Sequence, residues 1–239
     1  MRIPIDLHRP EMDDLHLQMR RACHDLNAPL RAVHGFADIL NRREAANLSA
    51  KGAAYLARMV AATEHMEQVV AGLHSYARVA SHALQRTSVA IAHLTHRLLV
   101  SHFDAEVNAA QLQWQAEESL EWPSDSTLLQ QIVQALVANG LRFVVPGVVP
   151  QVAVDWQQGE QLILTVTDHG IGIAPEYHQQ IFDLFVRLHG RDQYPGAGTG
   201  LALVARAVRL LGGSVELESE AGAGTTVRVC LPRLPERRP

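Results

Sequence analysis

The sequence predicts an α+β protein in which an N-terminal helical hairpin precedes an α/β two-layer sandwich. Between residues 12 and 80, apolar residues recur at steps of three and four, which is the spacing of amphipathic helices. After Ser81, short strand-like segments alternate with helical ones, a mixture that favours helices packed on one face of a sheet. We place a lead-in at 1–11, the hairpin at 12–82, the sandwich domain at 83–232 and a tail at 233–239.

Composition describes a globular chain with a sizeable core. The 239 residues are 47% hydrophobic and carry a formal charge of −4, without a basic block that would suit nucleic acid. Two cysteines are too few for a disulfide framework. No apolar run approaches a membrane span, and the N-terminus lacks the apolar stretch of a signal peptide. We therefore expect a cytoplasmic protein with no nucleic-acid partner.

The hairpin consists of two long helices joined by a short loop. The first should run from about Met12 to Arg43, and the second from a cap at Ser49 to about Ala80. Such a hairpin cannot cover its apolar stripe alone, so a homodimer that forms a four-helix bundle is expected. The alternative is that the stripe packs on the rest of its own chain.

The second domain alternates strands and helices. A strand start and a helix fit 88–110, a strand fits 111–116, and Asp125 lies where a helix opens that reaches about Phe143. The remaining expected elements are strands at 151–156, 161–168, 214–219 and 225–231, and helices near 175–185 and 200–211.

His24 lies in the first helix but off its apolar stripe, so its imidazole should face solvent. Asp25 follows it, and Pro29 removes the amide that would bond the Asp25 carbonyl, so a kink is expected there. A carboxylate beside an exposed histidine can hold one tautomer and leave the other ring nitrogen as a nucleophile. However, the chain has 13 histidines, and an exposed histidine is more often only a solvated side chain.

Three glycine-rich segments occur in the second domain, at 168–173, 196–200 and 222–226. The first follows an apolar strand and begins with Asp168, and the second precedes a predicted helix. Glycine lets backbone amides approach phosphate oxygens, and a helix N-terminus favours negative charge. Any one of these segments alone would more simply be a turn, but together they suggest a nucleotide site.

Six motifs in order resemble those of sensor histidine kinases: a dimerisation and phosphotransfer hairpin followed by an ATP-binding domain of the Bergerat (GHKL) type. The matching segments are 24–30 for the H-box, 139–143 for the N-box, 168–173 for the first glycine box, 181–185 for the F-box, 198–203 for the second glycine box, and 222–226 for a third glycine motif. Residues 187–195, here called the lid segment, look most like those of phytochrome-like kinases.

The resemblance implies ATP and Mg²⁺ as ligands and a role for each matching residue. Asp168 would accept a hydrogen bond from the adenine amino group, Asn139 would give an oxygen to Mg²⁺, and His24 would be phosphorylated with Asp25 as orienter or proton acceptor. The other residues implied in nucleotide binding are Arg142, Arg187 and Arg191 at phosphate oxygens, Gly170 and Gly172 beside the base, and Gly198, Thr199, Gly200, Leu201 and Thr225. The phosphoryl group would then pass to an aspartate of a response-regulator receiver domain.

Three alanines depart from the family pattern. Ala28 stands four residues after His24, where an amide or hydroxyl residue often positions the water that dephosphorylates the partner, so weak phosphatase activity is expected. Ala135 replaces the first asparagine of the N-box, which would weaken nucleotide or Mg²⁺ binding, and Ala202 replaces the last glycine of the second glycine box, where it suits a helix.

Two other functions stay open on the sequence alone. One is a phosphotransfer or scaffold protein whose ATP domain has degenerated, and the other is an ATPase of the chaperone or topoisomerase kind. Retention of Asn139 and Asp168 disfavours the first, and the His24 hairpin disfavours the second. We recognise no sensory domain ahead of the hairpin, so either the chain is an excised core or its signal comes from a partner in trans.

Overall fold

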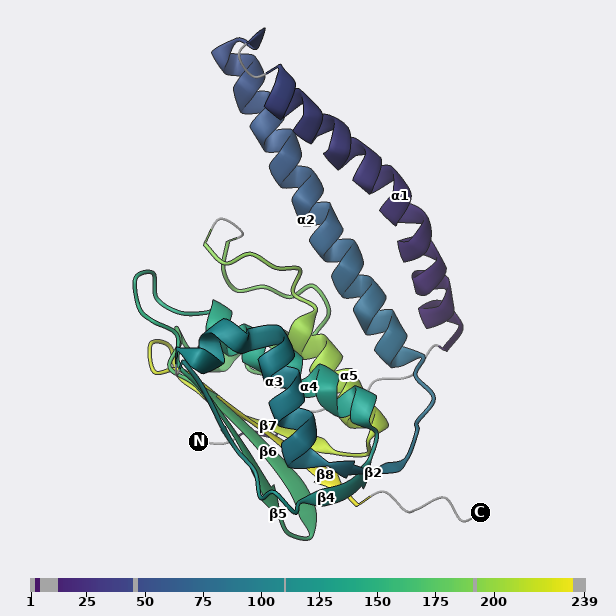
Figure 1. The fold of residues 1–239 in the computed structure, drawn as a ribbon, viewed down its shortest axis with the longest axis vertical. Helices are drawn as coiled ribbons and strands as arrows, with labels where there is room; N and C mark the ends of the chain where they lie inside the picture. The colour runs from purple at the N-terminus through teal and green to yellow at the C-terminus, as the bar shows by residue number, and fades with distance from the viewer. Residues whose placement is uncertain (1–2, 5–12, 45–46, 110, 191–192, 234–239) are drawn as a thin grey trace.

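The computed structural model describes residues 3–4, 13–44, 47–109, 111–190 and 193–233, and it divides into a helical hairpin and an α/β domain (Figure 1). The hairpin pairs α1 (Asp13–Arg43) with α2 (Ala50–Ala80). Ser49 caps α2 as expected, because its hydroxyl accepts a hydrogen bond from the amide of Gly52 at 3.1 Å. The predicted hairpin is therefore confirmed, although Met12 lies outside the described residues.

The seam of the hairpin follows a seven-residue repeat. In α2 the side chains of Leu56, Thr63, Val70 and Ala77 are buried at this spacing, as expected for helices that pack nearly parallel. Helix α1 continues through Pro29 without ending, and Figure 1 shows it curving along its length. The missing amide of proline thus leaves the helix intact.

A six-stranded sheet forms the base of the second domain, in the order β1-β7-β8-β6-β5-β3. Among the strands of this sheet that the structure describes, only β3 and β5 pair in parallel. Strands β2 and β4 make a separate antiparallel pair. The strand bounds are β1 Ile3–Pro4, β2 Thr87–Ala90, β3 Leu112–Gln115, β4 Glu121–Ser124, β5 Val152–Gln158, β6 Gln161–Asp168, β7 Ser214–Ser219 and β8 Thr225–Pro232.

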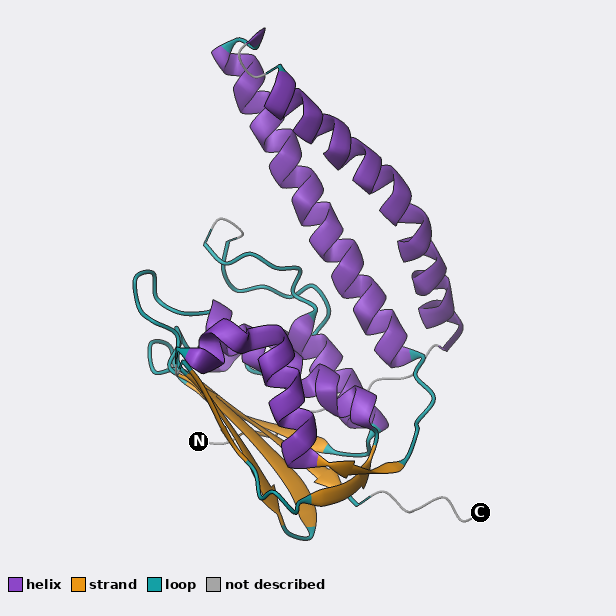
Figure 2. Ribbon diagram, in the orientation of Figure 1, coloured by secondary structure: helices purple, strands orange, loops and turns teal. Residues whose placement is uncertain are grey.

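Three helices cover one face of the sheet, as Figure 2 shows: α3 (Ile91–Asn108), α4 (Ser126–Arg142) and α5 (Gly200–Leu210). The core between the two layers is apolar, and its fully buried side chains include Trp122, Leu128 and Leu164. The predicted α+β class with a two-layer sandwich is thus confirmed.

Three details differ from the expectation. The helix expected near 175–185 is two short 3₁₀ turns, Pro175–Tyr177 and Gln180–Phe182, after which Asp183 is extended. Strand β4 was not predicted, because its four residues include a proline and pair with the distant β2. Residues Ile3–Pro4 of the expected lead-in pair with β7 at the edge of the sheet.

The junction between the two parts is fixed by buried polar groups. Asp125, only 1% exposed, accepts hydrogen bonds from the amides of Thr127 and Leu128 at the start of α4, from the Gln85 amide, and from Nε2 of His82. The buried Arg206 of α5 donates to the carbonyl of Ala80 at the end of α2. Within the described ranges, no helix is long and apolar enough to cross a membrane.

Candidate functional site

A pocket of about 280 Å³ opens between α4, the N-terminus of α5 and the end of β6. The lining includes Asp168 with Ile171, Gly172 and Ile173, and also residues 187–189 and 195–199, which precede α5. The lining is mainly apolar with a few polar groups, which is typical of small-molecule sites.

Asp168 is the acidic group of this pocket, at the last position of β6. Its Oδ1 accepts hydrogen bonds from the amides of Gly170 at 2.8 Å and Thr225 at 3.2 Å. Burial raises the pKa of the Asp168 carboxyl, although these two amides and nearby His169 lower it in part. Because Oδ1 is held by the backbone, Oδ2 is the oxygen left to accept a hydrogen bond from a ligand.

Glycine is required beside Asp168 because backbone segments meet there. A Cβ on Gly172, which has a positive φ of 64°, would overlap the carbonyl oxygen of Glu220. A Cβ on Gly170 would overlap the carbonyl oxygen of Phe143. These glycines therefore let the loop after β6 pack against the loop before β8 and against the end of α4.

The pocket also carries positive charge. Arg142 and Arg187 both line it, and the pKa of Arg142 is lowered by burial and by the neighbouring Arg187 cation. Asn139 lies one turn before Arg142 on α4, and a Cβ on Gly200 would come within 3.4 Å of its side-chain amide. The N-terminus of α5 is also here, and Thr199 makes no side-chain cap. Two cations and uncapped amides together form an anion site.

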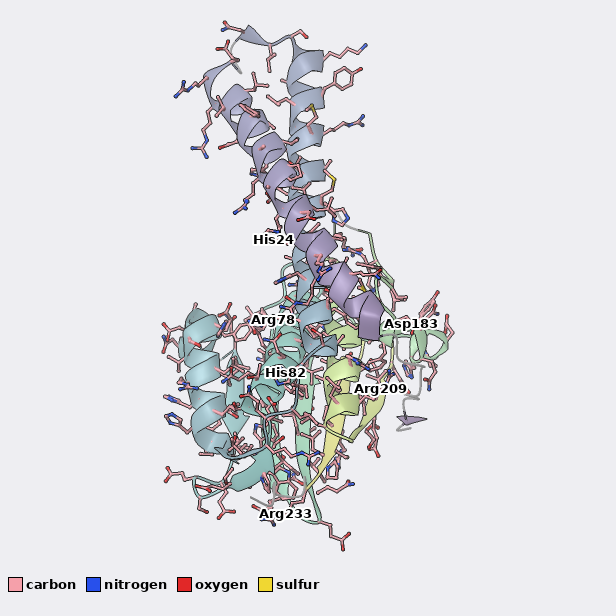
Figure 3. The ribbon with its side chains drawn as sticks, turned by 90° about the vertical axis from the view of Figure 1, so that its right-hand side faces the viewer. His24, Arg78, His82, Asp183, Arg209 and Arg233 are labelled. Carbon is pink, nitrogen blue, oxygen red and sulfur yellow. The ribbon has the colours of Figure 1, made fainter. Side chains whose placement is uncertain are left out.

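His24 lies on α1, outside the pocket, and Figure 3 shows it above the second domain. Its side chain is 88% exposed, and Nδ1 is 3.3 Å from Oδ1 of Asp25. This contact favours the tautomer that carries its proton on Nδ1 and leaves the lone pair of Nε2 toward solvent. The expected exposure of His24 and its pairing with Asp25 are confirmed.

A second, mostly apolar groove of about 510 Å³ lies between the hairpin and the pocket. Leu26 and Leu30 of α1 and Val69 of α2 line its hairpin side. Arg187 and Ala197 line its other side and also belong to the pocket. The helix that bears His24 therefore lines a groove that shares Arg187, one of the pocket's two arginines, with the pocket.

The structure gathers most of the predicted nucleotide-binding residues around one cavity. The lining includes Asn139, Arg142, Asp168, Gly172, Arg187, Gly198, Thr199, Gly200, Leu201 and Thr225. Gly170 is not among the residues that line the pocket, and Arg191 lies outside the described residues. Ala135 also faces the pocket, one turn before Asn139.

Comparisons with known proteins agree with this arrangement. Residues 124–235 match the family model for histidine kinase-, DNA gyrase B-, and HSP90-like ATPases. Over 221 residues the chain is 29% identical to the phytochrome-like protein Cph1 of Synechocystis sp., covering 88% of this chain and 28% of that protein. Over 218 residues it is 32% identical to the histidine protein kinase DivJ of Caulobacter vibrioides, covering 88% of this chain and 36% of DivJ.

The fold also matches a solved structure of full-length ShkA in complex with AMPPNP. The TM-score is 0.64 at 24% identity, over 92% of this chain and 46% of ShkA. The chain spans about a third of the length of the curated relatives above. Residues 124–235 thus match the ATPase family of histidine kinases, DNA gyrase B and HSP90, and the chain as a whole is similar in sequence to histidine kinases and in fold to ShkA.

Proposed function

We propose that the chain is an ATP-dependent protein histidine kinase that phosphorylates His24 and passes the phosphoryl group to an aspartate of a response-regulator receiver domain. The observation that carries this proposal is the presence, in one chain, of a pocket with an acidic and a cationic end and of an exposed histidine whose Nδ1 is engaged. Neither feature alone selects a kinase, but a kinase needs both.

The acidic end of the pocket suits adenine, and the cationic end suits phosphates. Oδ2 of Asp168 is the free acceptor for the exocyclic amino group of the base, while Oδ1 stays with the amides of Gly170 and Thr225. At the other end, Arg142, Arg187 and the amides that begin α5 offer positive charge to a polyphosphate. This polarity would direct the terminal phosphate toward the side of the pocket that adjoins the hairpin.

Asn139 is the residue that fits a magnesium ion. Its amide oxygen is a hard ligand at the cationic end of the pocket, and no group of three His, Cys, Asp or Glu that could hold a metal occurs among the described residues. An ion bound here would take its remaining ligands from phosphates and water, as Mg²⁺ usually does. When bound, Mg²⁺ neutralises charge on the phosphates during transfer.

At the hairpin, Nε2 of His24 would be the nucleophile. Asp25 holds the proton of Nδ1, so the lone pair of Nε2 can attack phosphorus without prior deprotonation. As the N–P bond forms, the bond from the γ-phosphorus to the bridging oxygen would break and ADP would leave, and Asp25 would stabilise the positive charge that the imidazole gains. The same exposure that lets ATP approach His24 would let a receiver domain approach the phosphohistidine.

The hairpin is expected to form a homodimer. Large apolar side chains of both helices are exposed, and Phe36 is the most open at 68%. The others are Leu26, Val33, Ile39, Leu40, Tyr55, Met59 and Met66. A second copy that completes a four-helix bundle would bury this surface. A sensory partner in trans could deliver the signal to the same bundle.

The absence of a polar side chain at position 28 supports weak phosphatase activity. Ala28 is exposed one helical turn after His24, so it lies on the same side of α1 and offers no atom to orient a water. We expect Ala28→Thr to increase dephosphorylation of a phosphorylated receiver in the presence of ADP, with autophosphorylation unchanged. Rapid dephosphorylation by the unsubstituted protein would contradict this.

Ala135 favours a second candidate, a phosphotransfer scaffold with a degenerate ATP domain, because it removes a polar group from the pocket. Calorimetric titration with ATP and Mg²⁺ separates the two functions. The kinase requires binding that Asp168→Asn weakens, whereas the scaffold predicts no binding by a folded protein. An ATPase of the chaperone kind would instead hydrolyse ATP steadily, at a rate that His24→Gln leaves unchanged.

A further inference from the structure

Three polar residues form a row across one end of the six-stranded sheet. Asp168 of β6, Thr225 of β8 and Ser219 of β7 are paired in register on neighbouring strands. Side chains two positions apart on a strand share a face, so Thr225 and Ser219 lie on the same face as Val227 and Leu217, which line the pocket. Asp168 and Thr225 line it as well, whereas Ser219, only 8% exposed, does not. Ser219 can therefore affect a ligand only through its neighbours.

The Ser219 hydroxyl has three hydrogen-bond partners. It accepts from the amide of Ile173 at 2.9 Å, donates to the carbonyl oxygen of Gly224 at 2.7 Å, and lies 3.0 Å from Oγ1 of Thr225. A hydroxyl has one proton and two lone pairs. Because a carbonyl oxygen can only accept, the proton of Ser219 lies toward Gly224. The Thr225 hydroxyl must therefore be the donor in its contact with Ser219.

The direction of this proton decides what Thr225 offers to a ligand. With its proton directed to Ser219, Oγ1 of Thr225 has only lone pairs left. Oδ2 of Asp168 is also an acceptor, because Oδ1 is engaged by backbone amides. Two acceptors at paired positions of neighbouring strands suit a ligand group with two N–H donors, such as the amino group of adenine. A carbonyl oxygen at the same place would face only acceptors.

We propose that Ser219 is a positioning residue that helps to set base specificity: by holding the proton of the Thr225 hydroxyl, it makes the pocket favour an amino group over a carbonyl oxygen on a purine base. The inference rests on the proposed ATP-binding function and adds to it a residue outside the pocket. If Ser219 only satisfied the buried Ile173 amide and Gly224 carbonyl, its loss would affect every nucleotide equally, because these two groups do not distinguish one base from another.

The test compares ATP with inosine triphosphate, whose base carries a carbonyl oxygen where adenine carries its amino group. Ser219→Ala removes the acceptor of the Thr225 proton, so the hydroxyl can turn and donate to that carbonyl oxygen. Titration calorimetry on the full chain with Mg²⁺ gives the dissociation constants of both nucleotides, and circular dichroism checks the fold. If Ser219→Ala does not fold, Ser219→Cys takes its place, because a thiol fills a similar space and is only a weak acceptor.

Two further variants show whether Ser219 acts through Thr225. Thr225→Val removes the hydroxyl that Ser219 orients, so adding Ser219→Ala to Thr225→Val should not change the preference between the two nucleotides. Thr167→Val is the matched control. The Thr167 hydroxyl is 3.1 Å from that of Thr226 in the same sheet, and neither residue lines the pocket.

We expect Ser219→Ala to reduce the preference for ATP over inosine triphosphate roughly three- to tenfold, the effect of one net hydrogen bond. Thr167→Val should keep the preference of the unsubstituted protein. Three results would overturn the inference: an unchanged preference in Ser219→Ala, the same reduction when Ser219→Ala is added to Thr225→Val, or equal affinity of the unsubstituted protein for both nucleotides. Failure of the unsubstituted protein to bind ATP would overturn the proposed function itself, and with it this inference.

Discussion

Replacing Asp168 with asparagine should weaken ATP binding without lowering the stability of the fold. The amides of Gly170 and Thr225 both donate to Oδ1, so the asparagine must place its oxygen there and its NH₂ group at the Oδ2 position. Two donors, the NH₂ group and the adenine amino group, would then face each other. Loss of a hydrogen bond to a charged acceptor costs about 1.5–3 kcal/mol, or roughly a 10- to 100-fold weaker affinity for ATP.

The same substitution should not destabilise the protein at neutral pH. Burial raises the folded-state pKa of Asp168. The carboxyl group therefore stabilises the fold at pH values below its unfolded-state pKa, and this contribution is lost as the pH rises through its folded-state pKa. At pH 7 the ionised Asp168 carboxylate therefore carries a desolvation cost that a neutral asparagine does not have. In the unsubstituted protein, ATP affinity should fall on acidification through this raised pKa, at higher pH than for an ordinary aspartate.

Titration calorimetry with ATP and thermal unfolding, each measured on both proteins, check this prediction. Asp104→Asn is the matched control, because Asp104 is exposed on α3 and away from the pocket. Equal ATP affinity for Asp168→Asn and the unsubstituted protein would refute the assignment of Oδ2 as the ligand acceptor. A large loss of thermal stability would refute the argument that the buried charge is costly.

Two further predictions concern the junction and the hairpin. Asp125→Ala should lower the free energy of unfolding by about 3 kcal/mol, since it removes the cap of α4 and leaves the Gln85 amide and His82 without their acceptor; urea unfolding measures this loss, and a change below about 1 kcal/mol would contradict it. Phe36→Glu should weaken dimerisation by about tenfold or more in sedimentation experiments, because it places a charge where an apolar ring is expected to be buried, while ATP binding stays unchanged. Val100→Glu, which changes an exposed side chain of α3, is its control, and a dimer that tolerates Phe36→Glu would exclude this face of the hairpin.

The elements that the sequence predicts best are those with local, repeated signals. Helices α1 and α2 have long periodic stripes, and β6 is an apolar run that ends in Asp168. The segment 175–185 carried a helical signal, but the chain turns extended at Asp183 after only two 3₁₀ turns. Strand β4 depends on pairing with the distant β2, which no local pattern reveals.

The residues of the candidate site divide in the same way into those with a local sequence signal and those that depend on distant contacts. Asp168, Asn139 and the glycine turns were predictable because their motifs have a fixed spacing, and ten predicted residues do line one pocket. Only part of the hydrogen-bond network at Asp125 could be predicted from the sequence. The capping role of Asp125 is local, whereas its hydrogen bond to His82 spans 43 positions. The hydrogen bond from the Tyr194 hydroxyl to the Val144 carbonyl likewise spans 50 positions, and only the folded chain reveals it.

The central claim is that His24 receives the phosphoryl group of ATP bound in this pocket, and one labelling experiment tests it directly. Incubation with γ-labelled ATP and Mg²⁺ should give a protein-bound label that is lost in acid and stable in alkali. His24→Gln should abolish this label and still bind ATP, because His24 lies outside the pocket. A label that persists in His24→Gln, or a folded, ATP-binding protein that never becomes labelled, would contradict the account.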